Sequence, residues 1–178
     1  QSLRHQLASK AVERLNCPVI YLNQVGGNDE LIFDGGSFAL NKNAEPTLTL
    51  PQCVTAIAIW EPSLEKKIDD NPPSSTQEQL FKALVLGVRD YAKKCNFNSA
   101  LIGLSGGIDS ALVAIIATAA LGATKVTSLL MPSPWSTTSS MTDALQLSER
   151  LGINKHIVPI DSLMRSFDSA LTNPLGKF

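Results

Sequence analysis

Long apolar runs are missing from this 178-residue chain. None reaches the roughly 18 residues that a membrane-spanning helix needs, and the opening segment QSLRHQLASKAVERLN lacks the apolar core of a signal peptide. Cysteine is scarce, because only three are present, at wide and irregular spacing. This excludes an even disulfide set and a Cys-based metal motif. We therefore expect a protein without membrane contacts that works in the reducing cytoplasm.

An excess of charge of either sign is also absent, since 15 Lys and Arg stand against 16 Asp and Glu. Domains that bind nucleic acid or anionic membranes usually carry net positive charge. Neither nucleic acid nor a membrane is therefore expected as a partner. Because the chain begins with Gln rather than Met, we also expect a piece of a longer polypeptide. Its length suits one domain or parts of two.

The first 60 residues predict one helix followed by short strands, as in part of an α/β or α+β sandwich. Apolar residues recur on one helical face over 3–15, and Asn16 and Pro18 end that helix. Branched and aromatic residues between turn signals predict the strands, and GGND at 26–29 is predicted to be a turn. The predicted strands are 19–25, 30–33, 37–40, 47–50 and 54–60.

The composition changes over 61–75, EPSLEKKIDDNPPSS, which is charged, rich in proline and without an apolar stripe. We interpret it as a linker between a segment 1–60 and a second domain, 76–178. Ser75 followed by Glu78 is a capping-box signature. It opens a predicted amphipathic helix that runs to about Lys94 and suits packing on a sheet.

Strands and helices alternate in the second domain, which predicts a parallel sheet built from right-handed crossovers. Gly122 is placed to cap the first of the two helices that separate these strands, and Gly152 ends the second. A loop rich in Pro, Ser and Thr lies between the second strand and the second helix. The predicted elements are strand 99–104, helix 110–121, strand 126–131, loop 132–140, helix 141–152 and strand 155–160.

The turn SGGIDS at 105–110, between the first strand and helix of that domain, predicts a phosphate site. Backbone N–H groups and the positive end of a helix attract anions, and glycines let a phosphate come close. Ser105 and Ser110 add hydroxyl donors, and Asp109 suits a phosphate only if Mg²⁺ lies between them. No Lys follows as in a Walker A loop, and the glycine spacing is not that of a dinucleotide fingerprint. The plain alternative is that Ser105 and Asp109 only cap the helix.

SGGIDS is similar to the pyrophosphate loop of the N-type ATP pyrophosphatases, a group that includes the NAD, GMP, asparagine and argininosuccinate synthetases. The wider segments 101–122 and 129–153 resemble glutamine-dependent NAD synthetases. Residues 4–40, above all NQVGGNDELIFDG, resemble the C-terminal part of the nitrilase-type glutaminase domain of those enzymes. GMP synthetases carry a different, class I glutaminase, so this segment favours the NAD synthetases.

The resemblance implies an α/β fold in which a partial nitrilase-like α-β sandwich segment precedes a Rossmann-like parallel sheet of the adenine nucleotide alpha hydrolase-like type. It implies ATP-dependent amidation of nicotinic acid adenine dinucleotide to NAD with ammonia from glutamine, through an adenylated intermediate, with AMP and pyrophosphate released. It further implies ATP and Mg²⁺ as cofactors and a homo-oligomer. Two alternatives remain: another N-type ATP pyrophosphatase, either GMP synthetase-like or tRNA-modifying, or a non-catalytic adenine nucleotide-binding module.

The resemblance also implies which residues bind ATP. The loop would hold the leaving pyrophosphate, Asp109 would hold the metal, and Met131 would contact adenine through its backbone. The loop from Ser133 to Ser140 is expected to order over ATP. The implied ATP-binding residues are Gly103, Leu104, Ser105, Gly106, Gly107, Ile108, Asp109, Ser110 and Met131.

No catalytic residue of the glutaminase is expected in this chain, because its Glu, Lys and Cys lie upstream of the segment that this chain resembles. Cys17, Cys53 and Cys95 are interpreted as structural, and Lys10 and Glu30 are not assigned to the triad. His5 and His156 have no metal-ligand spacing and are likewise interpreted as structural or exposed. The family's later Gln-Ala-Arg and Asn-Lys-Ser-Glu segments are also absent, so we expect the chain alone to be inactive.

Overall fold

A computed structural model describes residues 2–62 and 75–175 of the chain. Most of the predicted linker, 63–74, lies outside the described residues. The chain divides into two compact units, residues 1–91 and 92–178, and each unit is described by itself.

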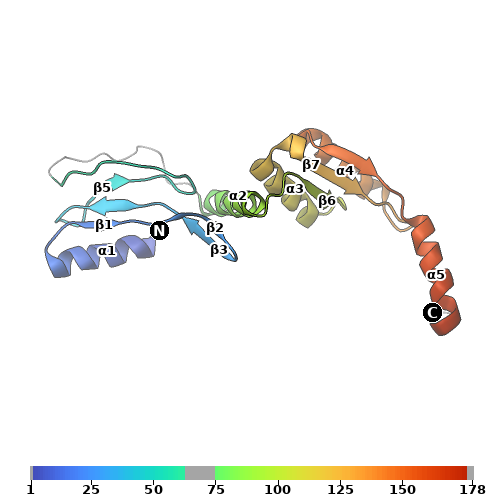
Figure 1. The fold of residues 1–178 in the computed structure, drawn as a ribbon, viewed down its shortest axis with the longest axis horizontal. Coiled ribbons are helices and arrows are strands. Elements are labelled where there is room, and N and C mark those ends of the chain that lie inside the picture. The colour runs from blue at the N-terminus through green and yellow to red at the C-terminus, as the bar shows by residue number, and fades with distance from the viewer. Residues whose placement is uncertain (1, 63–74, 176–178) are drawn as a thin grey trace. The chain divides into compact units, whose positions relative to one another are not determined.

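In the first unit, helix α1 (Ser2–Leu15) lies along an antiparallel sheet of β1 (Val19–Tyr21), β4 (Phe38–Leu40) and β5 (Pro46–Thr49), in the order β1-β4-β5 (Figure 1). Apolar residues on the predicted face of α1 pack on the central strand, where all three residues are buried. His5 stacks on the ring of Phe38 at a centroid distance of 3.8 Å. The predicted helix is confirmed, and so are the predicted strands 30–33, 37–40 and 47–50.

Two predictions near the start of the first unit, for the strand 19–25 and for the turn GGND, are wrong. The stretch 19–25 is not one strand, because the chain breaks after Tyr21 and a new strand, β2 (Val25–Asn28), pairs with β3 (Leu31–Asp34) in a separate hairpin. Residues 26–28 of GGND therefore belong to a strand, and the turn lies at 29–30. The break is fixed by Asn23, whose side-chain amide donates to Asp34 and to the carbonyl of Gly35.

The predicted strand 54–60 does not form. A strand with alternating apolar residues needs another element to cover its apolar face. No described residue covers that face here, since Ile57 and Ile59 are 96% and 95% exposed. Helix α2 (Thr76–Lys94) follows the linker, and the Glu78 N–H donates to Ser75 Oγ at 3.1 Å. That hydrogen bond confirms the Ser75 half of the predicted cap.

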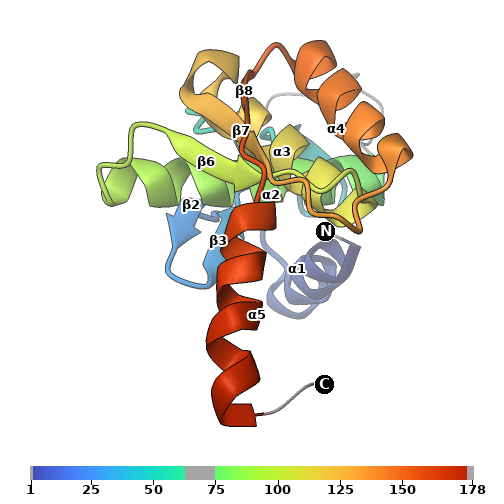
Figure 2. The ribbon, with the colours of Figure 1, turned by 90° about the vertical axis from the view of Figure 1, so that its right-hand side faces the viewer.

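The second unit contains the predicted parallel sheet, in the order β6-β7-β8 (Figure 2). Gly122 and Gly152 cap α3 and α4 as expected, both with positive φ. Both helices begin earlier than predicted, and the last strand is shorter. The elements are β6 (Ala100–Gly103), α3 (Ile108–Leu121), η1 (Ala123–Lys125), β7 (Val126–Leu130), α4 (Thr138–Leu151), β8 (Asn154–Ile157) and α5 (Asp161–Leu175).

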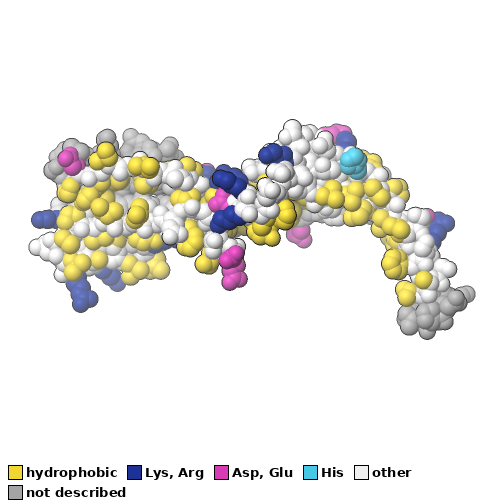
Figure 3. Space-filling model, in the orientation of Figure 1, with side chains coloured by type: hydrophobic (Ala, Val, Ile, Leu, Met, Phe, Trp, Pro, Cys, Tyr) yellow, Lys and Arg dark blue, Asp and Glu magenta, His cyan; other side chains and the backbone are white. Residues whose placement is uncertain are grey.

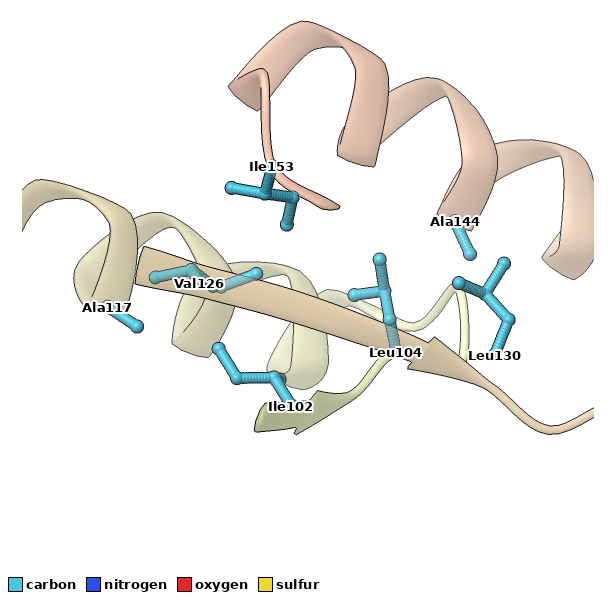
Figure 4. Packing of buried hydrophobic residues seen from close by; sticks show 8 residues of the cluster. Ile102, Leu104, Ala117, Val126, Leu130, Ala144 and Ile153 are labelled. Atoms are coloured by element: carbon cyan, nitrogen blue, oxygen red, sulfur yellow. The ribbon is translucent and has the colours of Figure 1, made fainter. Parts of the chain in front are cut away.

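Alternate residues of β7 form the centre of the second unit's core, because its burial alternates along the strand. Leu130 and Val126 are fully buried, and between them Ser128 Oγ lies 2.9 Å from Ser148 Oγ of α4. Each of these hydroxyls also reaches a backbone carbonyl, so the polar pair is satisfied. The core cluster is Ile102, Leu104, Ala114, Ala117, Val126, Leu130, Ala144 and Ile153 (Figure 4).

Helix α5 was not predicted. Three apolar residues of this helix recur at intervals of four residues and remain exposed. They are Leu163 at 59%, Phe167 at 68% and Leu171 at 46%. The helix extends away from the sheet in Figures 1 and 2, and hydrophobic side chains lie at its surface in Figure 3.

Truncating Leu130 is expected to destabilise the second unit. Leu130→Ala removes a fully buried side chain from the core and should lower the free energy of unfolding by about 2–5 kcal/mol. The matched control is Leu101→Ala on the neighbouring strand, whose side chain is 67% exposed and should cost about 0.5 kcal/mol or less. Denaturant unfolding measures both variants, and equal losses would contradict the assigned core.

Candidate functional site

The carboxyl ends of β6 and β7 meet at one edge of the parallel sheet. The strands run side by side from Ala100 and Val126, and the pairing continues past β6 because the Leu104 N–H donates to the Leu129 carbonyl at 2.9 Å. The SGGIDS turn and the Ser-rich loop therefore leave the sheet at the same edge. Open parallel sheets bind their ligands at this edge.

Two serines hold the turn in shape. The Ser105 N–H donates to Ser110 Oγ at 3.2 Å, and the two hydroxyl oxygens lie 3.0 Å apart. The Gly107 N–H donates to Ser105 Oγ at 3.2 Å, and the Ser110 hydroxyl reaches the Gly107 carbonyl at 3.0 Å. Each serine therefore joins the turn to the first turn of α3.

Several backbone N–H groups at this turn have no acceptor among the described residues. They belong to Gly106, Ile108, Asp109 and Ser110, since the first helical hydrogen bond runs from Ala111 to Gly107. The N-cap, Gly107, makes no side-chain cap, so the alternative that Ser105 and Asp109 serve only as caps gains no support. Unpaired N–H groups at the start of a 14-residue helix favour an anion at this position.

Gly106 is the closest point between the turn and α4. Its φ is +85°, and a Cβ there would lie 2.8 Å from both Cα and the carbonyl carbon of Ser140. Ser140 belongs to the first turn of α4, where its N–H donates to the side chain of the N-cap Thr137 at 3.2 Å. The turn and the start of α4 therefore touch backbone to backbone, which only glycine permits at position 106.

A cavity of about 210 Å³ lies at this edge of the sheet, between the turn and the Ser-rich loop. This is smaller than the roughly 300–1,000 Å³ of a typical small-molecule site, so it would enclose only part of a ligand of that size. Four of the predicted residues line it, and the other predicted residues lie outside its lining. The sequence analysis missed Leu129 and Met141, which are apolar wall residues. The lining is Gly103, Leu104, Ser105, Leu129, Met131, Ser136, Ser140 and Met141.

The family model for NAD synthase matches residues 80–176. The chain belongs to the NAD synthase family. A curated glutamine-dependent NAD(+) synthetase from Synechocystis is 47% identical over 95% of this chain and 31% of its own length. The structure of the Acinetobacter baumannii enzyme, solved in complex with ADP, matches with a TM-score of 0.92 and 35% identity over 99% of this chain and 34% of that one. The structure of an ammonia-dependent NAD synthetase from Campylobacter jejuni matches with a TM-score of 0.51 and 31% identity. The match covers 54% of this chain and 42% of the Campylobacter chain.

This chain spans about a third of the length of the curated relatives that it matches. Its mixed α/β fold, with a three-stranded parallel sheet and separate antiparallel sheets, matches the NAD synthetase structure. None of the helices within residues 2–62 and 75–175 is long and apolar enough to cross a membrane.

Asp109 is the one acidic residue within the SGGIDS turn. It is exposed and makes no ion pair with another described residue. No group of three His, Cys, Asp or Glu side chains converges within the described part of the chain. A Mg²⁺ ion that arrives on a nucleotide needs only one or two protein carboxylates, so the single aspartate of this turn fits such an ion.

The three cysteines differ in their exposure, since Cys53 is buried and the other two are exposed. Burial raises the pKa of the Cys53 thiol, helped by the nearby Asp34 carboxylate, and this disfavours the reactive thiolate. Cys17 and Cys95 are exposed and free. Burial lowers the pKa of His5, which stacks on the ring of Phe38, and so disfavours the charged imidazolium form.

Proposed function

We propose that this chain is the part of a glutamine-dependent NAD synthetase that holds the phosphates of ATP. In this proposal residues 1–60 are the C-terminal part of a nitrilase-like glutaminase domain, 61–75 are a linker, and 76–178 begin the synthetase domain of the adenine nucleotide alpha hydrolase-like type. The 47% identity to the Synechocystis enzyme over 95% of the chain supports the assignment of both segments to one such enzyme, because the similarity extends through both.

The observation that carries the proposal is the row of unpaired N–H groups at the start of α3. They lie in the turn that the family resemblance assigns to pyrophosphate, and the ADP complex of the Acinetobacter relative supports an adenine nucleotide at this fold. Ser105 and Ser110 hold the turn rigid, so the donors need no reorganisation when negative charge moves onto the leaving group. Met131, whose side chain lies opposite Gly103 in the cavity wall, is proposed to contact adenine through its backbone.

In the proposed reaction the carboxylate of nicotinic acid adenine dinucleotide attacks the α-phosphorus of ATP. The bond to pyrophosphate breaks, and an acyl adenylate forms. Ammonia from glutamine then attacks the acyl carbon, AMP leaves, and one proton is released. Mg²⁺ on ATP would neutralise phosphate charge, and Asp109 would hold it. The chain's own contribution is to bind and orient the leaving pyrophosphate.

The proposal includes partners and a location. Nicotinic acid adenine dinucleotide and glutamine would be the substrates of the whole protein, with no nucleic acid or membrane partner. A homo-oligomeric assembly and a cytoplasmic location remain predictions from the sequence. The glutaminase Glu, Lys and Cys would be supplied by residues outside this chain, so we expect no complete reaction from the 178 residues alone.

The test uses the full-length polypeptide that contains this chain, with Mg-ATP, nicotinic acid adenine dinucleotide and glutamine. We expect NAD, AMP and pyrophosphate in equal amounts. ADP in place of AMP would exclude attack at the α-phosphorus and overturn the assignment of the SGGIDS turn. AMP released only with a different carboxylate or carbonyl acceptor would keep the turn's role and assign the protein to another N-type ATP pyrophosphatase. Nucleotide binding without any turnover would favour the non-catalytic module.

A further inference from the structure

Two of the chain's three methionines line the cavity beside the SGGIDS turn, and they differ in exposure. Met131, which follows β7 directly, is 46% exposed, whereas Met141 on α4 is half-buried. The third, Met164 on α5, is also half-buried and is not among the lining residues. Met131 is therefore the methionine of this cavity that solvent reaches most easily.

The end of β7 explains the position of Met131. Side chains alternate across a strand, and Leu130 is fully buried in the core of the second unit (Figure 4). Leu129 and Met131, on either side of it in the chain, both line the cavity. A Cβ at Gly103 on the neighbouring β6 would lie 3.5 Å from Met131 Cε, an ordinary van der Waals distance. The end of the Met131 side chain therefore lies beside a residue without a side chain and forms part of the cavity wall.

The thioether of an exposed methionine is a target for oxidation by hydrogen peroxide. Sδ gives up two electrons and takes one oxygen atom from the peroxide, so that the O–O bond breaks, an S–O bond forms and water leaves. The product is a sulfoxide, which is polar and chiral where the thioether is apolar. Methionine sulfoxide reductases reverse the change. Oxidation at this position would therefore place a reversible polar group in the wall of the cavity.

We propose that Met131 is an oxidation site, and that its sulfoxide lowers the affinity of the cavity for the base of a nucleotide. This inference rests on the proposed function, in which adenine contacts the backbone of Met131. A base at that backbone lies within reach of the sulfoxide oxygen, and covering this oxygen without a hydrogen-bond donor is unfavourable. The phosphates would bind at the backbone N–H groups of the SGGIDS turn. Oxidation should therefore weaken the binding of ATP and spare the binding of pyrophosphate, which has no base.

The experiment uses the full-length polypeptide that contains this chain, before and after treatment with hydrogen peroxide. Mass spectrometry of its peptides measures the addition of an oxygen atom at Met131, and titration measures the affinities for Mg-ATP and Mg-pyrophosphate. We expect oxidation to weaken Mg-ATP binding about tenfold and to leave pyrophosphate binding within about twofold. Methionine sulfoxide reductases should restore the affinity for ATP.

Met131→Leu is the decisive variant, because it removes the sulfur and keeps an apolar side chain of similar volume. Each variant is compared with itself before and after oxidation, so a change in its starting affinity does not affect the result. Met131→Leu should keep its affinity for Mg-ATP on oxidation. Met141→Leu and Met164→Leu are the matched controls and should lose as much affinity as the wild type.

Several outcomes would overturn the inference. Met131 could stay unmodified while Met164 is oxidised, or Met131→Leu could lose as much affinity as the wild type. Protection by Met141→Leu would assign the effect to the other methionine of the cavity. Equal losses of ATP and pyrophosphate binding would mean that oxidation disturbs the fold rather than the contact with the base. An untreated wild type that binds no Mg-ATP would overturn the proposed function itself.

Discussion

Gly106→Ala should reduce AMP-forming turnover of the full-length protein by about 10²-fold or more. The new Cβ would lie 2.8 Å from two backbone atoms of Ser140, and the residue would have to keep a φ of +85°. A side chain in this left-handed region costs roughly 1–2 kcal/mol, and the backbone overlap can be relieved only by moving the turn or the start of α4. Either movement misplaces the N–H groups that are proposed to bind pyrophosphate. Steady-state formation of AMP measures the effect.

Gly122→Ala is the control that separates the effect of the steric overlap with Ser140 from the effect of the positive φ. Gly122 also has a positive φ, +92°, but a Cβ there would meet nothing within 4 Å. Both variants place a side chain at a positive φ, but only Gly106→Ala should lose turnover. If the two variants kept equal activity, the close approach between the turn and α4 would have no role in the reaction.

The second unit could be predicted largely from its sequence because its signals are local. Apolar strands, glycine C-caps and the alternation of strands with helices each depend on residues that are close in the chain, and the right-handed crossover rule turns them into a parallel sheet. Gly122 and Gly152 both cap helices in the structure. Helix α5 was missed although Asp161 lies at its start and its apolar residues recur at intervals of four. Its apolar residues stay exposed among the described residues, so no packing against the sheet accompanies this local signal.

The first unit shows why other features could not be predicted. GGND has the composition of a turn, and nothing within it indicates that Gly27 lies against a helix 60 residues later in the chain. The stretch 54–60 alternates like a strand, but strand formation needs a neighbouring strand that the sequence pattern does not report. The contact between Gly106 and Ser140 is of the same kind. The sequence shows where these glycines are, but the residues that they contact depend on tertiary packing.

Asp109→Asn should lower the rate of AMP formation by about 10²–10³-fold, comparable to the loss of one group that stabilises transition-state charge. Asp109 is exposed on the first turn of α3. The substitution should therefore cost only about 0.3–1 kcal/mol of stability, from the weaker interaction with the helix dipole. Thermal unfolding of the same preparation separates this small structural effect from the large effect on turnover. Glu149→Gln, at the carboxyl end of α4, is the charge-matched control and should leave turnover unchanged.

The direction of the change in ATP affinity decides what Asp109 does. If its carboxylate holds Mg²⁺ beside the phosphates, Asp109→Asn should weaken the binding of Mg-ATP, and a higher Mg²⁺ concentration should restore part of the loss. If no metal lies between them, the carboxylate only repels the phosphates, and removing its charge should tighten ATP binding. Titration of ATP at several Mg²⁺ concentrations distinguishes the two signs. Tighter binding in the variant would remove Asp109 from the metal site and leave the N–H groups of α3 as the nucleotide's main contact.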